Sequence, residues 1–407
     1  MDLQSGSFYW PTTLHEAETP SYPPLAEDAD CDVLIVGCGS SGAQCAYYLA
    51  ETGLKIIMVD KRKAGMGSTA TNTALIQYAG DKTFTGLVNS FGESCALRHL
   101  KRCEEAIQEI EASCASLPFD AEFVRRDTLY SAFCEEDVPQ LQTEYALLTK
   151  HGFDVEWWEE ERIASHYPWR RKAAIYYKND AEMNPYTYNL GLLEHARSRG
   201  VRIYEHTEIN GHQFEQDYNL FYTGDGYTIK ASHVIIASGY EGLEFRGEKN
   251  AVITSSYSIV TEPVEAFTGW HVRTLLWDSA RPYIYARTTA DRRIIIGGLD
   301  ESTSYAEQRD AKLKHKSELL LQELAKLFPA IPAKIAYQIA AFYGGTHDGL
   351  PIIGQYDDFP RCYYLFGYGD NGTVYNMVLA REIRDLIMTG SSPYSDIYLQ
   401  TRPVLNP

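Results

Sequence analysis

The chain has 407 residues, a formal net charge of −18 at pH 7 and a hydrophobic share of 44%. This length exceeds what a single hydrophobic core usually serves, so we expect two domains. An acidic surface repels phosphate backbones, which argues against nucleic acid as a partner. No stretch approaches the roughly 18 uninterrupted apolar residues that a membrane-spanning helix needs, so we expect no span.

The cysteines and the amino terminus indicate a cellular compartment. The 8 cysteines form no CxxC pair and no Cys/His group with zinc spacing, so we expect no metal site. Residues 1–30 have neither the basic start nor the apolar core of a signal peptide. Both observations favour a reducing cytoplasm. Residues 1–29 instead predict an extended arm that is pinned to a domain by aromatic residues such as Tyr9, Trp10 and Tyr22.

A βαβ pattern follows the arm. Apolar residues 32–36 predict a short buried strand, and residues 42–52 predict a helix that stops at Gly53, because glycine suits a left-handed cap. Residues 55–60 predict a second strand, parallel to the first.

The rest of the chain alternates helical and extended patterns. Residues 89–150 have helical periodicity, with a second helix over 137–151. The further elements that we expect are a helix at 189–200, a strand at 201–206, a strand-turn-strand over 213–230 with its turn at 224–226, strands at 232–238, 256–261, 281–287 and 293–298, and helices at 304–328 and 373–388.

A glycine motif joins the first predicted strand to the first predicted helix. Gly37, Gly39 and Gly42 form GxGxxG, in which the glycines permit a tight turn, the approach of a pyrophosphate and close helix packing. The helix would then direct its free N–H groups and positive dipole end at the phosphates. Asp60 ends the next strand, where a carboxylate accepts both ribose hydroxyls and disfavours the 2′-phosphate of NADP. Together these features predict a dinucleotide site.

The βαβ unit alone does not say which dinucleotide binds. No second GxGxxG follows a strand elsewhere, so a separate NAD(P) domain is not expected. The small and hydroxylic residues 67–73 (GSTATNT) permit close backbone approach and hydrogen bonds to an extended cofactor.

With these motifs the sequence resembles the D-amino-acid oxidase-like FAD-dependent oxidoreductases, which include glycine oxidase, sarcosine oxidase and gamma-glutamylputrescine oxidases. The resemblance covers nearly the whole chain, and the ordered series of segments is specific although most single segments are not. The segments are Tyr9-Trp10, Tyr22-Pro-Pro-Leu, the GxGxxG, Gly67-Ser68-Thr69, Val155-Glu-Trp, Asn184-Pro185, Val234 to Gly239, Tyr283 to Gly298, Thr346 to Gly354 and Gly367 to Gly372.

The resemblance implies a mixed α/β architecture. We expect a Rossmann-type FAD-binding domain and a discontinuous α+β substrate domain built on a mainly antiparallel sheet. The implied boundaries are an arm at 1–29, a cofactor domain at 30–88, 168–250 and 341–407, and a substrate domain at 89–167 and 251–340.

It also implies FAD bound in extended form. The residues implied to contact it, from the adenosine half to the flavin ring, are Gly37, Gly39, Ser41, Gly42, Asp60, Lys61, Ile209, Gly239, Ser68, Thr69, Asn72, Thr73, Asp370, Asn371, Gly372 and Thr373. The last four begin the final predicted helix, whose dipole would stabilise negative charge on the reduced ring.

Several positions depart from the family pattern. Gln77 and Val374 stand where sarcosine oxidases place cationic ligands for the substrate carboxylate. Ile295 replaces the lysine associated with oxygen activation, and Ala341 replaces the cysteine that anchors flavin covalently. We therefore expect noncovalent FAD, with carboxylate recognition and rapid reaction with oxygen both in question.

Five residues are candidates for the substrate pocket: Gln77, Tyr285, Arg287, Tyr343 and His347. Tyr285 and Arg287 alternate with Tyr283 along a strand, so they would lie over the flavin with Arg287 as an anion anchor, unless the strand is half buried and Arg287 faces solvent. Tyr343 lines the pocket or packs in the core, and His347 serves as a base or bonds a neighbouring loop.

The predicted reaction is oxidation of a C–N bond in an amine or amino acid, by hydride transfer to flavin N5. Oxygen or an electron carrier would reoxidise the flavin. Three alternatives stay open: a flavin dehydrogenase that passes electrons to a quinone or carrier protein, a noncatalytic flavin-binding protein, and an NAD-dependent dehydrogenase.

Overall fold

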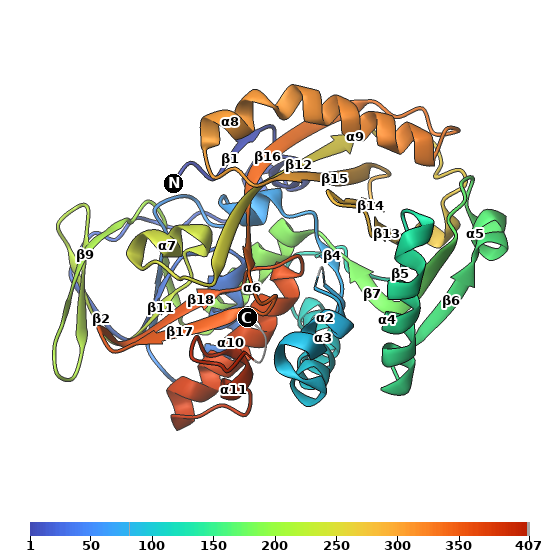
Figure 1. Cartoon of the computed structure of the whole chain (residues 1–407). Helices are drawn as coiled ribbons and strands as arrows, with labels where there is room; N and C mark the ends of the chain where they lie inside the picture. Colours follow the sequence, from blue (N-terminus) through green and yellow to red (C-terminus); the bar gives the residue numbers. More distant parts are fainter. Residues whose placement is uncertain (81, 405–407) are drawn as a thin grey trace.

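The computed structural model describes residues 1–80 and 82–404 and contains two large sheets (Figure 1). The smaller, eight-stranded sheet has the order β17-β18-β11-β2-β3-β8, with β10 paired to β11 and β9 to β10. Neighbours from β18 to β8 run parallel, and β17, β10 and β9 add antiparallel pairings. The strands are β2 (Ala29–Val36), β3 (Ile56–Val59), β8 (Arg202–Tyr204), β9 (Ile209–Phe214), β10 (Asn219–Thr223), β11 (Thr228–Ile236), β17 (Ile352–Tyr356) and β18 (Phe359–Phe366).

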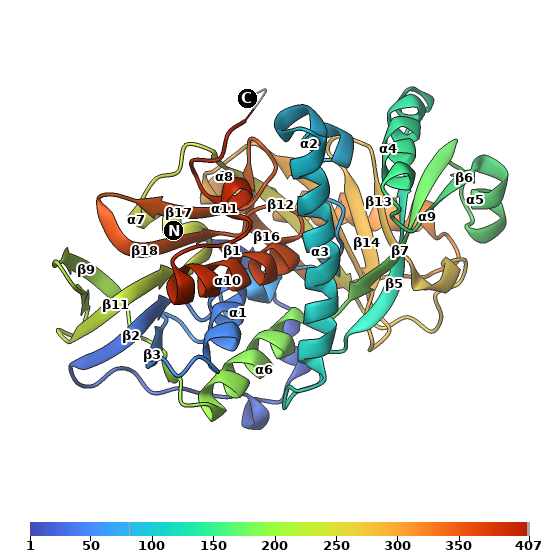
Figure 2. The same ribbon diagram turned by 90° about the horizontal axis from the view of Figure 1, so that it is seen from below.

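Three helices pack together against this sheet. Figure 2 shows α1 (Ser40–Leu49) between α6 (Pro185–Ser198) and α10 (Gly372–Thr389). The amide oxygen of Asn184 accepts hydrogen bonds from the backbone N–H groups of Tyr186 and Thr187, which caps the start of α6. The parallel strands between helices confirm the predicted Rossmann-type domain.

The larger, ten-stranded sheet has the order β1-β16-β12-β15-β14-β13-β5-β7-β4, with β6 paired to β7. All of its pairings are antiparallel except that of β13 with β5. The strands are β1 (Gln4–Gly6), β4 (Leu75–Ile76), β5 (Val124–Ser131), β6 (Val155–Glu159), β7 (Ala173–Glu182), β12 (Ala251–Thr261), β13 (Leu275–Asp278), β14 (Ile284–Thr288), β15 (Ile294–Glu301) and β16 (Ile335–Thr346).

Helices cover this sheet as well. In Figure 1, α8 (Ala306–Ala311) and α9 (Leu313–Leu327) lie across β12, β15 and β16, and α9 buries Leu320 and Leu324 against them. The other helices are α2 (Phe84–Phe91), α3 (Glu93–Cys114), α4 (Val138–Lys150), α5 (Glu160–His166), α7 (Gly242–Phe245) and α11 (Ser395–Tyr398). No helix within the described ranges is long and apolar enough to cross a bilayer.

The predicted fold class is confirmed, but several elements differ from the expectation. The helical stretch expected over 89–150 contains strand β5, which forms because β7 and β13, distant in the chain, supply its hydrogen-bonding partners. The helix expected over 304–328 is divided into α8 and α9 at Lys312, and α1 ends at Leu49, before Gly53. The domain boundary expected at 168 assigns β7 to the cofactor domain, although β7 pairs within the larger sheet.

The amino-terminal arm is fixed by the contacts of its aromatic residues. Tyr9 and Trp10 are each 2% exposed, and the indole N–H of Trp10 donates a 2.6 Å hydrogen bond to the carbonyl oxygen of Asn72. The arm also contributes β1, which pairs with β16 and so extends the larger sheet.

A buried ion pair joins the loop before β17 to the carboxyl-terminal segment. The guanidinium of Arg402 donates to both carboxylate oxygens of Asp348, over 2.7 and 2.9 Å, and both residues are less than a tenth exposed. Replacing Asp348 by Asn would leave the Arg402 charge buried without a counterion. We expect the Asp348→Asn variant to lose about 3–5 kcal/mol of unfolding free energy, measured by urea denaturation.

The exposed pair Arg98–Asp396 provides the control. An Asp396→Asn variant is expected to lose less than about 1 kcal/mol, because solvent screens an exposed pair. Equal losses in the two variants would contradict the structural role assigned to the buried pair.

Candidate active site

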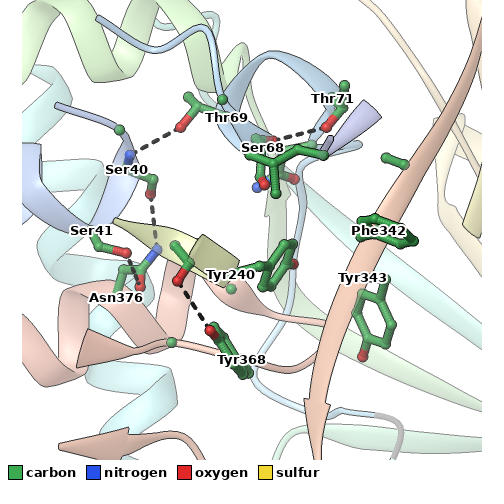
Figure 3. A pocket seen from close by; sticks show the side chains of 18 of the residues that line it. Ser40, Ser41, Ser68, Thr69, Thr71, Tyr240, Phe342, Tyr343, Tyr368 and Asn376 are labelled. Atoms are coloured by element: carbon green, nitrogen blue, oxygen red, sulfur yellow. Dashed lines mark hydrogen bonds between the residues drawn. The ribbon is translucent and has the colours of Figure 1, made fainter. Parts of the chain in front are cut away.

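A cavity of about 480 Å³ lies between the two sheets. One end is formed by the carboxyl ends of β2, β3 and β11 in the smaller sheet, and the other by a face of the larger sheet. Figure 3 shows Ser40, Ser41 and Asn376 on one side and Phe342 and Tyr343 projecting from β16 on the other. In open parallel sheets, ligands bind at the carboxyl ends of the strands, and this cavity lies there.

The floor of the first end is backbone that tolerates no side chain. Gly37 has φ +116°, and a Cβ there would lie 2.4 Å from the carbonyl oxygen of Ala237. A Cβ on Gly42 would lie 1.9 Å from the carbonyl oxygen of Gly37. Both neighbours are backbone atoms in paired strands or adjoining turns, so they cannot move aside. The two glycines therefore permit α1 to begin directly at the end of β2.

Hydroxyl and amide groups surround the start of α1. The Ser40 N–H donates to Oγ1 of Thr69 over 3.0 Å, and the Ser41 hydroxyl donates to Oδ1 of Asn376 over 2.9 Å. The amide of Asn376 in turn donates to Oγ of Ser40 over 3.2 Å (Figure 3). This network joins the amino-terminal turns of α1 and α10, so two positive helix ends meet at the cavity.

Asp60 is held at the end of β3. Its carboxylate oxygens accept hydrogen bonds from the N–H groups of Cys38 and Arg62, each over 2.8 Å. Burial raises the pKa of Asp60, and these two hydrogen bonds oppose the rise. The carboxylate lines the cavity, as a ribose-binding acid requires.

A charged cluster that sequence reasoning did not identify lies beside Asp60. Both oxygens of Glu241 accept from the Arg62 guanidinium, over 2.7 and 2.8 Å, and Lys61 lies 3.1 Å away. The amino-terminal ammonium of Met1 also contacts Glu241. Burial alone would raise the pKa of Glu241, but its bonds to Arg62 and Lys61 outweigh burial and lower it to about 2. No local motif reveals this cluster, because its members come from three separate segments.

A single register row of the larger sheet lines much of the second end. Trp277 pairs with Tyr285 across β13 and β14, and Tyr285 pairs with Gly297 across β14 and β15. The row continues through Ser258 of β12 to Ile339 of β16. Directly paired residues place their side chains on the same face, so Trp277, Tyr285, Ser258 and Ile339 all reach the cavity.

Gly297 provides the space for the Tyr285 ring. A Cβ at this position would lie 2.3 Å from the Tyr285 hydroxyl oxygen, so a larger residue would displace the tyrosine. Burial raises the pKa of Tyr285, which keeps its phenol protonated. Behind Trp277, the ring of Tyr130 stacks at a centroid distance of 3.9 Å and fixes the indole plane.

Gln77 follows β4 and lines the same end of the cavity. Its side-chain amide donates to Oγ1 of Thr128 over 3.2 Å, and the Thr128 hydroxyl donates to the Asp180 carboxylate over 2.6 Å.

Nearby, the hydroxyls of Tyr343 and Tyr283 both donate to Oδ1 of Asp370. Asp370 therefore contacts two tyrosines, of which Tyr343 lies in β16 and Tyr283 directly before β14.

Most of the predicted site residues line this cavity. Those that do are Gln77, Tyr285, Tyr343, Gly37, Gly39, Ser41, Asp60, Lys61, Ser68, Thr69, Asn72, Thr73, Ile209, Gly239, Asp370 and Gly372. Three more lie directly behind the lining. Gly42 contacts the Gly37 backbone, Asn371 donates to the Ala79 carbonyl, and the Thr373 hydroxyl accepts a hydrogen bond from Asn72.

Arg287 and His347 lie elsewhere. Arg287 is 1% exposed, donates to the Met183 carbonyl over 2.8 Å and lies 3.9 Å from Glu182, so it neither faces solvent nor belongs to the described lining. His347 is exposed on the loop before β17, and its backbone N–H bonds Asn250. The structure thus brings neither residue to the cavity.

The geometry agrees with comparisons to known proteins. The family model "DAO: FAD dependent oxidoreductase" matches residues 32–386. The chain belongs to this family. It is 26% identical to a putative Rieske 2Fe-2S iron-sulfur protein of Bacillus subtilis, over 98% of this chain and 76% of that protein. It is 22% identical to gamma-glutamylputrescine oxidoreductase of Escherichia coli, over 92% of this chain and 88% of that protein.

A solved structure shares the fold. The crystal structure of glycine oxidase from Geobacillus kaustophilus matches with a TM-score of 0.75 and 20% sequence identity, over 91% of this chain and 98% of that one. The chain is thus an FAD-dependent oxidoreductase of the DAO family. Its glycine floor, its two helix amino termini and Asp60 fit a dinucleotide with a pyrophosphate and a ribose.

The glycine floor leads to a testable prediction. In a Gly42→Ala variant the new Cβ would overlap the Gly37 carbonyl, so the glycine turn and the start of α1 could not both keep their present positions. We expect the purified variant to retain less than about a tenth of the wild-type flavin per chain, measured from visible absorbance and protein concentration. Gly247→Ala is the matched control, because a Cβ there meets no atom within 4 Å. Full flavin content in Gly42→Ala would contradict the role of the floor.

The charged cluster predicts a pH dependence. The folded-state pKa of Glu241 lies below its ordinary value, so its stabilising contribution is present above about pH 4.5 and lost as the pH falls towards 2. A Glu241→Gln variant should therefore lose about 2 kcal/mol of unfolding free energy at pH 7 and progressively less between about pH 4.5 and pH 2.

The measurement is urea denaturation at several pH values. Glu244→Gln serves as the control, because Glu244 also contacts the Met1 ammonium but its side chain is half exposed. A constant difference between wild type and Glu241→Gln across the acid range would refute the assignment.

Proposed function

We propose that the protein oxidises a C–N bond of an amine or amino acid. One observation carries this proposal: a single cavity connects the glycine floor, where a pyrophosphate fits, to an aromatic and polar wall of the larger sheet. An extended FAD that spans the cavity would hold its ring against that wall. Membership of the DAO family supports the same reaction class, as does the similarity to gamma-glutamylputrescine oxidoreductase, which is named for an amine.

When bound, FAD would supply the acceptor for a hydride, which is two electrons and one proton, from the carbon that bears the nitrogen. The amine nitrogen loses a proton, so the carbon–nitrogen bond becomes a double bond, and water then hydrolyses the imine to a carbonyl compound and a free amine or ammonia. The chain's own task is to orient the C–H bond and to exclude bulk water.

The described residues suit this task. Trp277, Tyr285 and Tyr343 enclose the ring end with aromatic surface, and the contacts of Trp277 with Tyr130 and of Tyr343 with Asp370 fix two of these side chains. The described lining contains no serine–histidine or cysteine–histidine pair of the kind that covalent catalysis uses. A reaction that depends on orientation rather than on a protein nucleophile fits this lining. It contains no cysteine or histidine either, which supports noncovalent FAD.

The proposal predicts anaerobic bleaching of the flavin. Purified protein mixed with members of an amine and amino-acid panel should lose its visible absorbance, and the carbonyl product should appear in a one-to-one ratio with reduced flavin. If every amine and amino acid leaves the flavin oxidised, the proposal fails.

A carrier protein is the second candidate for the electron acceptor. Ile295 stands where related oxidases carry a lysine associated with oxygen activation, and it is 1% exposed within the sheet. A relative that covers 98% of this chain is named as a Rieske iron–sulfur protein. We expect faster turnover with an artificial one-electron acceptor than with air, and little peroxide; peroxide equal to the amine consumed would identify an oxidase.

A further inference from the structure

We propose that the substrate is an amine without an adjacent carboxylate, and that the side-chain oxygen of Gln77 accepts a hydrogen bond from the amine nitrogen of that substrate. This inference rests on the proposed amine oxidation and narrows its substrate class. It follows from the position of the cations, from the orientation of the Gln77 amide and from the aromatic wall.

Among the described residues, the cavity lining offers no cation to a substrate carboxylate at the wall of the larger sheet. Within the described lining, the cationic side chains are Lys61 and Arg62, which follow β3 in the smaller sheet and both contact Glu241. The charged group among the described residues at the wall end is instead the carboxylate Asp370. A substrate carboxylate would be desolvated there without a counterion and close to a like charge, which is costly.

A hydrogen-bond chain behind the wall orients the Gln77 amide. Asp180 accepts from the Thr128 hydroxyl over 2.6 Å and from the Tyr78 N–H over 3.3 Å. An ionised carboxylate can only accept, so Thr128 must give its proton to Asp180 and its lone pair to the NH₂ group of Gln77. This arrangement fixes the NH₂ end of Gln77 towards β5.

The oxygen end of Gln77 is then the part available to a ligand. Gln77 is 7% exposed and lines the cavity. Its Oε1 is not one of the fully buried polar atoms that lack a hydrogen-bond partner. An acceptor at this position recognises an N–H group, whether the amine is charged or neutral, and it repels a carboxylate oxygen.

The protonation state of Asp180 decides how firmly this orientation is held. Thr128 and Asp180 are both fully buried, and burial raises the pKa of Asp180 to about 7 against the hydrogen bonds from Thr128 and Tyr78, which lower it. Above this pH Asp180 is ionised, so it can only accept hydrogen bonds and the Thr128 hydroxyl must donate to it. Binding is therefore best measured at about pH 8.5, where the carboxylate is ionised.

The aromatic wall completes the recognition. Trp277 and Tyr285 are adjacent in the register row, and Tyr343 comes from β16. Such rings favour a cation or an alkyl chain over an anion, because their faces carry partial negative charge. The wall thus favours an amine over a carboxylate, as Gln77 does.

The test uses two probes that share a tert-butyl group, differ in the sign of their charge and cannot undergo the proposed oxidation. The nitrogen-bearing carbon of tert-butylammonium carries no hydrogen, and pivalate replaces the ammonium by a carboxylate. Dissociation constants are obtained from the change in flavin absorbance during titration of the holoprotein. We expect wild type to bind tert-butylammonium about tenfold or more tightly than pivalate.

Three variants identify the cause of this preference. Thr128→Val removes the hydroxyl that fixes the amide and should reduce the preference to about threefold or less. Gln77→Arg supplies a cation at the same position and should reverse it. Thr274→Val is the matched control, because Thr274 is equally buried but lies outside the cavity lining, and it should keep the wild-type ratio.

The outcomes separate this inference from the proposed function. Equal or tighter binding of pivalate to wild type overturns the inference, as does an unchanged ratio in a folded, flavin-loaded Thr128→Val. Should Thr128→Val lose its flavin, the Gln77→Arg reversal decides. Because neither probe is turned over, the ratio is measured even if no amine bleaches the flavin, and that separate result would refute the proposed reaction.

Discussion

The close approach of backbone at Gly37 and Gly42 is the constraint on which the cavity depends. With a Cβ-to-oxygen separation of only 1.9 Å, a side chain at Gly42 cannot coexist with the Gly37 carbonyl. Only three residues therefore separate helix α1 from β2, and the amino-terminal turn of α1 lies at the cavity, where Thr69 accepts a hydrogen bond from the Ser40 N–H. The hydrogen bonds of Ser40, Ser41 and Asn376 then bring the start of α10 to the same place. A second positive helix end at one cavity suits a cofactor that carries phosphates and becomes anionic when reduced.

The opposite wall is built on a different principle. Strands β12 to β16 lie within residues 251–346, and their register places Trp277, Tyr285, Ser258 and Ile339 in one row. A shift of one residue in any strand would turn its member of the row to the other face. Tyr285 also needs a glycine as its partner at position 297, because its ring occupies the volume that a Cβ on Gly297 would take. The wall is thus a property of the sheet rather than of a local motif.

Charge is distributed unequally between the two ends. The described cationic lining residues, Lys61 and Arg62, lie at the end expected for the adenosine half and are bound to Glu241. The wall end carries Asp370, tyrosine hydroxyls and the Gln77 amide. Glycine oxidase, whose solved structure shares this fold, and gamma-glutamylputrescine oxidoreductase, a sequence relative, are named for different substrates. A shared fold can serve different substrates through different site residues, and in our proposal the wall of the larger sheet makes that selection.

The sequence by itself determined the cofactor half of this protein, because that half consists of local signals. The GxGxxG lies between a strand and a helix, and Asp60 ends the next strand, so spacing along the chain was sufficient to predict a dinucleotide site. Only the tertiary structure decided the membership of β5 and β7 in the larger sheet, the burial of Arg287 away from the cavity, and the cluster around Glu241. It also revealed the hydrogen bonds that connect Gln77 through Thr128 to Asp180. These features depend on strand register and on contacts between residues far apart in sequence, and neither leaves a periodic or motif-like trace in the sequence.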